Sequence, residues 1–195
     1  MFPSQKETWY YPAGASFSDR QFSDRLQQFY ERQTAACFRK KLITKHGHLP
    51  VHFLCIGSDR VTGDCLGPLI GYKLSHYLPP GSVIGTLEHP VHALNLAAVL
   101  EMLATDDCGF YVAVDASLGD AHHIGCITLS PGAMQPGLGV RKDLPLVGHV
   151  SVTGIVGTLS DSGDALLQGT RLSLVMTLAD SITQGLLRFY SLCTP

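Results

Sequence analysis

The spacing of apolar residues divides the chain into helical and extended segments. Between residues 18 and 45, aromatic and leucine side chains recur every three or four positions, which predicts a helix. Residues 51–57, with the sequence VHFLCIG, form a continuous apolar run of the kind found in strands that are buried on both faces. Helical spacing returns in residues 172–192, which predicts a long closing helix.

The middle of the chain alternates between these two patterns. Helices are predicted at about residues 65–78 and 93–103, and short apolar strands at 82–86 and 109–115. With the first strand, this strand–helix–strand–helix–strand order predicts right-handed crossovers and a parallel sheet covered by helices on both faces. We therefore expect an α/β protein, built as a three-layer α/β/α sandwich around a mostly parallel sheet.

The remaining segments are less regular. Further strands are predicted at residues 124–129 and 150–156, and the Gly- and Pro-rich residues 131–142 predict a long loop. Residues 1–17 are polar and aromatic and are expected to form an extended N-terminal arm that docks on the body or on a second copy, which leaves a homodimer open. Residues 18–195 are expected to form a single α/β domain.

The composition narrows the classes of partner and location. The 195 residues suffice for one domain with a sizeable core, and the formal net charge of −2 gives no support for binding to nucleic acid or to an anionic membrane. The six cysteines form no CxxC pair, and several lie in apolar runs, as in proteins of a reducing cytosol. Neither a secretory signal nor a membrane-spanning run is visible, so a cytoplasmic location is expected.

Two aspartates stand at the ends of predicted strands. Asp64 follows the first strand, and Asp115 ends the third, 115 − 64 = 51 residues later. Ligands of open parallel sheets bind beyond the carboxyl ends of the strands, where the strand order reverses. If the spatial order of the first three strands is 2-1-3, both aspartates rise into the same crevice.

Two carboxyl groups in one crevice are compatible with more than one chemistry. They can share a proton and act as base and acid on an attacking water, or they can hold a divalent metal together with a histidine. Each also has a purely structural interpretation, because Asp64 can cap the following helix and Asp115 can stabilise the turn after its strand. The residues alone leave these alternatives open.

Polar residues near the same strand ends are candidate contacts to a substrate. They are Ser58, Asp59, Thr62, Ser117, Thr153 and His149. The loop after the first strand lacks both GxGxxG and the Walker lysine, so a nucleotide site is not expected there. Cys65 has no paired histidine in evidence and is interpreted as a packing residue.

Several stretches resemble one known family. They are IGSDRVTGDCLGPLIG (56–71), VAVDASLG (112–119), HVSVTGIVG (149–157) and RLSLVMTLAD (171–180). These stretches are similar to the YyaC-type sporulation proteins (DUF1256), which are relatives of the germination protease of bacterial spores. The resemblance runs from about residue 54 to residue 187 and implies a phosphorylase/hydrolase-like fold, as in the hydrogenase maturation proteases.

The resemblance also implies an activity. In the germination protease, an aspartate in a T-P-D-A-L-G-P stretch and another in a D-A strand end are regarded as the catalytic pair of an unusual aspartic-type endopeptidase. The matching residues here are Asp64 and Asp115, which would cleave a peptide or protein substrate in the cytoplasm of a sporulating bacterial cell. Gly63 stands where the protease has proline, and the chain looks too short for the protease's insertions and pro-segment, so its substrate and zymogen control are not carried over.

Two alternatives accompany this leading hypothesis, which requires no cofactor. One is a catalytically inactive sporulation protein that binds a peptide or another ligand. The other is a metal-dependent maturation-type protease, because hydrogenase maturation proteases use an acid, an aspartate and a histidine around nickel. Asp64, Asp115 and His149 would then hold nickel or zinc, with His89 and His92 as the next histidine candidates.

Overall fold

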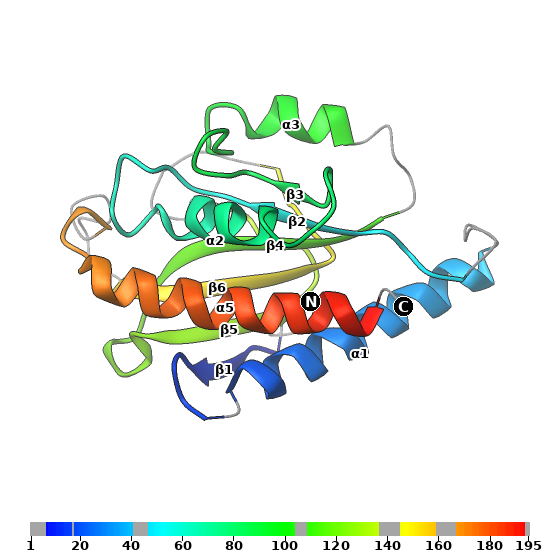
Figure 1. Ribbon diagram of the computed structural model, residues 1–195, viewed down its shortest axis with the longest axis horizontal. Helices are drawn as coiled ribbons and strands as arrows, with labels where there is room; N and C mark the ends of the chain where they lie inside the picture. The colour runs from blue at the N-terminus through cyan, green and yellow to red at the C-terminus, as the bar shows by residue number, and fades with distance from the viewer. Residues whose placement is uncertain are drawn as a thin grey trace, which may run out of the picture.

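The computed structural model describes residues 7–16, 18–40, 47–103, 109–136, 145–158 and 167–193. These residues form a six-stranded sheet that is flanked by helices (Figure 1). The helices are α1 (Ser18–Arg39), α2 (Leu66–Ser75), α3 (Leu96–Leu103), the 3-10 helix η1 (Ala121–His123) and α5 (Leu172–Cys193). The strands are β1 (Trp9–Pro12), β2 (Val51–Cys55), β3 (Val83–Ile84), β4 (Phe110–Gly119), β5 (Cys126–Pro131) and β6 (Val150–Thr158).

The sheet has the strand order β1-β5-β6-β4-β2-β3. The strands β3, β2, β4 and β6 run parallel to their neighbours, whereas β5 pairs antiparallel with β6 and β1 pairs antiparallel with β5. Since β2 lies between β3 and β4, the 2-1-3 order expected for the first three strands of the parallel part is confirmed. The carboxyl ends of β2 and β4 therefore lie at the same edge of the sheet.

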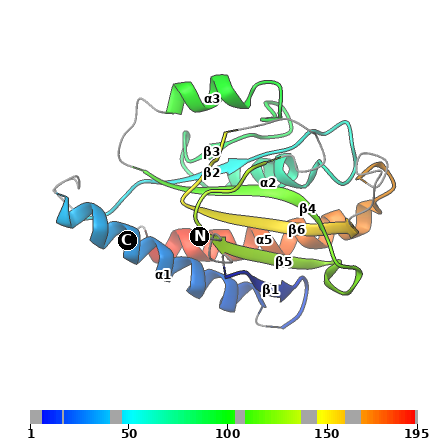
Figure 2. The same ribbon diagram turned by 180° about the vertical axis from the view of Figure 1, so that it is seen from behind.

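Alternating side chains divide the sheet into two buried faces. Phe53 and Cys55 of β2 pack in the main core with α1, α2 and α5, whereas Leu54 and Ala113 pack in a smaller cluster with Leu96 of α3. In Figure 1, α5 lies in front of the sheet. In Figure 2, which shows the molecule from behind, β4, β5 and β6 lie in front of α5. The three-layer α/β/α architecture is thereby confirmed.

The two longest helices lie side by side on the main core. Buried residues of α5 recur as Val175, Leu178, Ile182 and Leu186, and this apolar stripe faces the sheet and α1. In the part of the chain that the structure describes, no helix combines the length and the apolar character required to cross a membrane.

The N-terminal segment belongs to the sheet. Residues Trp9–Pro12, which were expected in an extended arm, are extended as β1, and they dock on the body by pairing with β5. Tyr11 is buried against Phe22 of α1, with ring centroids 6.0 Å apart, so α1 and the segment before it pack together. Residues 1–6 and Phe17 lie outside the described residues, and the domain boundary at residue 17 stays a prediction.

Close contact between α2 and β2 fixes the turn that joins them. Gly67 of α2 lies so near β2 that a Cβ atom on it would overlap the main chain of Ile56. Gly57, two residues after the end of β2, has φ +140°, and a Cβ there would overlap the carbonyl oxygen of Asp64. The two glycines therefore allow the turn at Asp64 to lie directly against the end of the strand.

A main-chain hydrogen bond of Gly63 connects the same turn to the segment before α5. Its main-chain N–H donates a hydrogen bond of 2.8 Å to the carbonyl oxygen of Leu167. Proline, which the germination protease has at the matching position, carries no N–H and could not make this bond. The departure from the protease motif thus has a structural role in this chain.

Candidate active site

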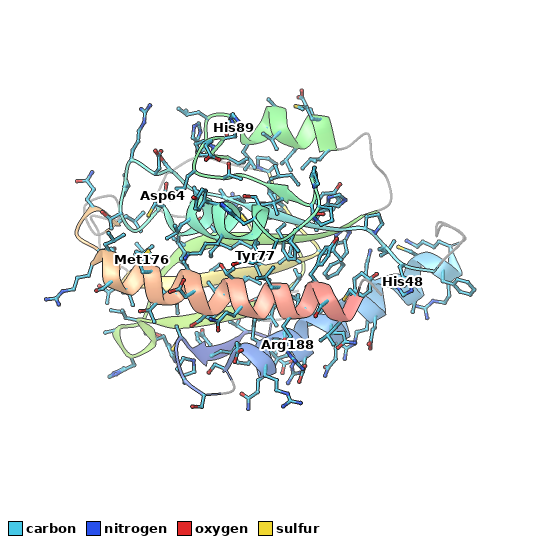
Figure 3. All side chains as sticks on the ribbon, in the orientation of Figure 1. His48, Asp64, Tyr77, His89, Met176 and Arg188 are labelled. Carbon is cyan, nitrogen blue, oxygen red and sulfur yellow. The ribbon has the colours of Figure 1, made fainter. Side chains whose placement is uncertain are left out.

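Asp64 lies in the turn between β2 and α2 (Figure 3). It does not cap the helix, because α2 begins at Leu66 and Cys65 occupies the N-cap position, with no side-chain cap hydrogen bond. Burial raises the pKa of the Asp64 carboxyl group, and a hydrogen bond from the main-chain N–H of Ser58 and the nearby His92 oppose this shift. The environment of Asp64 therefore favours its protonated form more than water does.

Asp115 lies within β4 and is 4% exposed. The prediction that it ends its strand and stabilises the following turn is wrong, because β4 continues to Gly119. Asp115 instead comes one residue after Val114, the last residue of β4 that pairs with β2. Its Oδ1 atom accepts a hydrogen bond of 2.8 Å from the main-chain N–H of Ala116. By strand alternation it faces the same side of the sheet as Ala113, away from the main core. In the sheet it stands directly opposite Thr153 of β6.

Asp64 and Asp115 line one cavity of about 510 Å³. The size is within the range of ordinary ligand sites. The other lining residues come from β1 and the residue before it, from β4, β5 and β6, from the segments that follow β4 and β5, and from the segment before α5. They are Thr8, Tyr10, Ala116, Ser117, Leu118, Gly119, Asp120, His123, Thr128, Ser130, Met134, Gln135, Thr153, Ile155 and Leu167. An aspartate from the turn after β2 and an aspartate from the interior of the neighbouring strand β4 thus line a common cavity.

A row of hydroxyl groups forms part of the cavity lining beside Asp115. Thr153 stands opposite Asp115, Thr128 opposite Thr153, and Tyr10 opposite Thr128, so one row of side chains crosses four strands. The Oγ1 atom of Thr153 is 2.8 Å from Ser117 Oγ and 2.7 Å from Thr128 Oγ1. We call Ser117, Thr128 and Thr153 the hydroxyl floor.

An aromatic pair forms another part of the lining. The ring of Tyr10 stacks on His123 of η1, with centroids 4.2 Å apart and planes at 20°. His123 Nδ1 lies 4.0 Å from Asp120 Oδ2, at the long end of an ion-pair contact. We call Tyr10, Asp120 and His123 the aromatic wall.

Comparison with known proteins identifies the family. Residues 25–185 match the model of a family described as "Protein of unknown function (DUF1256)". The chain belongs to the DUF1256 family. It is 37% identical over 181 residues to "Uncharacterized protein YyaC" of Bacillus subtilis (strain 168), covering 89% of this chain and 87% of that protein. A [NiFe] hydrogenase maturation protease, HycI from Thermococcus kodakarensis KOD1, matches with a TM-score of 0.39 and 14% identity, over 70% of this chain and 94% of that chain.

Only some of the other residues predicted to contact a substrate line the cavity of this DUF1256 chain. Ser117 and Thr153 line the cavity. Ser58 instead lies near Asp64 through its main-chain N–H, and Asp59 and Thr62 lie near Cys65, outside the cavity lining. Burial and the two neighbouring aspartates raise the pKa of the Cys65 thiol, which keeps it protonated and supports its role as a packing residue.

His149 does not join the two aspartates. It immediately precedes β6, four residues before Thr153, which places it about 13 Å along the strand direction from the row that contains Asp115. Its ring stacks on Phe110, and its Nδ1 accepts a hydrogen bond of 3.0 Å from the N–H of Tyr111. Among the described residues, no group of three or more histidine, cysteine, aspartate or glutamate residues could hold a metal ion. Asp64, Asp115 and His149 therefore do not fit a nickel or zinc site.

The setting of His149 predicts that acid destabilises the fold. Although His149 is exposed as a residue, burial of its ring against neighbouring side chains lowers its pKa, and Nδ1 can accept the Tyr111 N–H only while it carries no proton. A histidine with a lowered pKa in the folded state stabilises the fold above its unfolded pKa of about 6.5, and this contribution is lost as the pH falls from there towards the folded pKa.

Urea unfolding between pH 8 and pH 5 measures this effect. The variant His149→Phe keeps the stacked ring but cannot titrate. We expect its free energy of unfolding to decrease less below pH 6.5 than that of the native chain. His122→Gln, a change at an exposed histidine of η1, should leave the loss as it is in the native chain. An unchanged pH dependence in His149→Phe would show that this hydrogen bond does not control acid stability.

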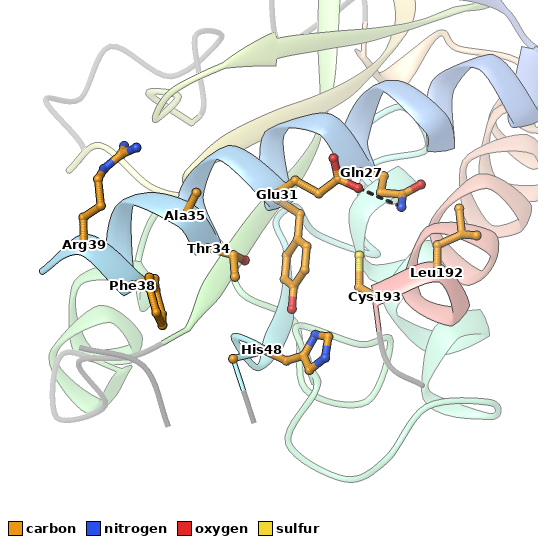
Figure 4. Close-up of a pocket in the computed structure, with 11 residues that line it drawn as sticks. Gln27, Glu31, Thr34, Ala35, Phe38, Arg39, His48, Leu192 and Cys193 are labelled. Atoms are coloured by element: carbon orange, nitrogen blue, oxygen red, sulfur yellow. Dashed lines mark hydrogen bonds between the residues drawn. The ribbon is translucent and has the colours of Figure 1, made fainter. Parts of the chain in front are cut away.

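A second cavity, of about 580 Å³, lies between the C-terminal halves of α1 and α5 (Figure 4). Its lining includes the exposed Phe38 and Leu192, and Gln27 donates a hydrogen bond of 3.0 Å to Glu31 there. Burial raises the pKa of the Cys193 thiol to about 12, so this sulfur is no nucleophile at neutral pH. The described lining holds no pair of carboxyl groups, so the candidate site is the cavity at Asp64 and Asp115.

Proposed function

We propose that this DUF1256 chain is a hydrolase that uses Asp64 and Asp115 to cleave a peptide bond with an activated water. The observation that carries the proposal is that these two carboxyl groups, from the turn after β2 and from the neighbouring strand β4, line one cavity. General acid–base catalysis needs two groups in opposite protonation states within reach of the same bond. The raised pKa of Asp64 suits it to be the acid.

The proposed reaction proceeds through a tetrahedral intermediate. Asp115, as the ionised base, takes a proton from water while the water oxygen attacks the carbonyl carbon, and Asp64 gives its proton to the carbonyl oxygen. When the intermediate collapses, the C–N bond breaks, the proton on Asp115 passes to the leaving nitrogen, and Asp64 recovers a proton from the hydroxyl group. Both aspartates then have their starting protonation states, as in enzymes whose carboxyl pairs share protons.

The biological setting is proposed on the motif resemblance alone. The T-G-D-C-L-G-P stretch around Asp64 and the V-D-A stretch around Asp115 resemble the germination protease, which favours a peptide or protein substrate in a sporulating cell. We extend the proposal to the cytoplasm of such a cell on this basis.

Hydrolysis in water enriched in ¹⁸O tests the proposed reaction. We incubate the purified full chain with a mixed peptide pool and expect mass spectrometry to find new termini, with ¹⁸O in the new carboxyl group. Iodoacetamide and EDTA should leave the rate unchanged, since neither a thiol nor a metal takes part in the proposed steps. Absence of cleavage, or cleavage that EDTA abolishes, would contradict the proposal.

A further inference from the structure

The cavity lining carries negative charge near the two aspartates. Its described residues include three carboxyl groups, those of Asp64, Asp115 and Asp120, and neither lysine nor arginine. With Asp64 protonated, as in the proposed mechanism, Asp115 and Asp120 supply the negative charge. Charges that line a concave surface act on a ligand through less water than charges on an open surface, so their field is focused into the cavity. This lining repels an anionic ligand and attracts a cationic one.

The hydroxyl floor adds hydrogen-bonding capacity without adding charge. Each hydroxyl group of Ser117, Thr128 and Thr153 both donates and accepts, so the chain of contacts at 2.7 and 2.8 Å can reorient towards either kind of partner. Peptide groups, which present one N–H donor and one carbonyl acceptor per residue, match such a surface. Because the floor begins opposite Asp115, a peptide held there has its main chain near the proposed base.

The aromatic wall offers a place for a cationic side chain. Tyr10 is 46% exposed, although one face of its ring stacks on His123. The carboxyl group of Asp120 lies beside the same histidine. A carboxylate together with an aromatic ring is a common setting for ammonium and guanidinium groups.

We propose that the cavity binds a polypeptide segment through a lysine or arginine side chain on the aromatic wall and through peptide groups on the hydroxyl floor. The inference rests on the proposed function for the identity of the scissile bond, but binding can be measured without cleavage. In this proposal, Asp120 makes the cavity prefer a cationic side chain over an anionic one. The hydroxyl floor binds the peptide groups of any segment, whatever the charge of its side chains.

Fluorescence anisotropy with two labelled, end-blocked peptides tests this inference. The peptides differ in one central residue, lysine or glutamate, and the receptor is the full-length Asp64→Asn chain, which does not cleave under the proposed mechanism. We expect the lysine peptide to bind at least about tenfold more tightly at low salt, and the preference to narrow as added salt screens the charges. Equal affinities, tighter binding of the glutamate peptide or no binding of either peptide would overturn the proposal.

Further variants separate the two parts of the cavity. Added to the same receptor, Asp120→Asn should weaken the lysine peptide by about threefold to fivefold, since the carboxyl group is largely exposed, while Glu101→Gln on α3 removes one exposed charge outside the cavity and should have no effect. Thr128→Val should weaken both peptides by the same factor, without changing the preference. Equal effects of Asp120→Asn and Glu101→Gln would overturn the assignment of the aromatic wall.

Two controls separate this inference from related explanations. Free butylamine that binds as tightly as the lysine peptide would assign the cavity to a small amine and overturn the peptide proposal. Selective binding of the lysine peptide by a native chain that cleaves no peptide would support the inference while contradicting the proposed hydrolysis. The two proposals can therefore fail separately.

Discussion

Replacing Asp115 by asparagine is expected to lower the rate of peptide cleavage about a thousandfold while the chain keeps its fold. The amide oxygen of asparagine can still accept the N–H of Ala116, which Asp115 accepts at 2.8 Å, so the local structure of β4 is retained. An amide cannot take a proton from water, so the proposed base is lost. Asp64→Asn removes the proposed acid and should reduce the rate by a similar factor.

Measured turnover numbers and thermal unfolding together check this prediction. Asp59→Asn is the matched control, because Asp59 is an exposed carboxylate just after β2 that does not line the cavity, and its rate should stay within about twofold of the native chain. The double variant Asp64→Asn/Asp115→Asn should be no slower than the slower single variant, since residues that act as a unit are not additive. Normal turnover in either single variant would remove that aspartate from the mechanism.

That Asp64 and Asp115 line one cavity could be predicted, because it follows from the order and direction of their strands. Parallel strands joined by right-handed crossovers end at one edge of the sheet, and the order β3-β2-β4 makes the two strand ends neighbours. No knowledge of side-chain contacts was needed for this step. The roles of the two groups depend on burial and hydrogen bonds, which the sequence does not report.

The same topological rule separates His149 from the site. Strand β6 runs parallel to β4, so the residue before β6 lies towards the opposite edge of the sheet from the end of β4. The prediction that His149 lies beside the aspartates is wrong, because it did not take the direction of β6 into account. His92, which ranked lower from sequence, is the histidine whose charge acts on the pKa of Asp64, because the chain beside it pairs with the end of β2.

The hydroxyl floor and the aromatic wall depend on pairing between distant strands. The registers of two antiparallel strand pairs bring Tyr10, Thr128 and Thr153 together. A shift of one residue in either register would move the side chains of the shifted strand to the opposite face of the sheet. A partial signal was present in β5, where Thr128 and Ser130 alternate with Ile127 and Leu129 and so mark one polar face. The sequence did not show that β1 would complete that face.

Gly67→Ala is expected to destabilise the fold by about 3 kcal/mol or more, although alanine favours helices over glycine by about 1 kcal/mol. The added Cβ atom would overlap the main chain of Ile56. This main chain is held by the hydrogen bond of 2.7 Å that the N–H of Ile56 donates to the carbonyl oxygen of Val114, so it cannot move aside as a flexible side chain can. Helix α2 must then shift away from β2 or lose its first turn. The free energy of unfolding in urea, from circular dichroism, measures the effect.

Ser75→Ala provides the matched control, because Ser75 is an exposed residue at the other end of α2, and its change should stay within about 0.5 kcal/mol. A Gly67→Ala chain as stable as the native one would show that the contact between α2 and β2 is looser than described. Where Gly67→Ala still folds, its turnover should also fall, because Asp64 lies just before α2 and moves with it, whereas Asp115 stays in β4. The close glycine contact would then serve both the stability of the fold and the position of the proposed acid.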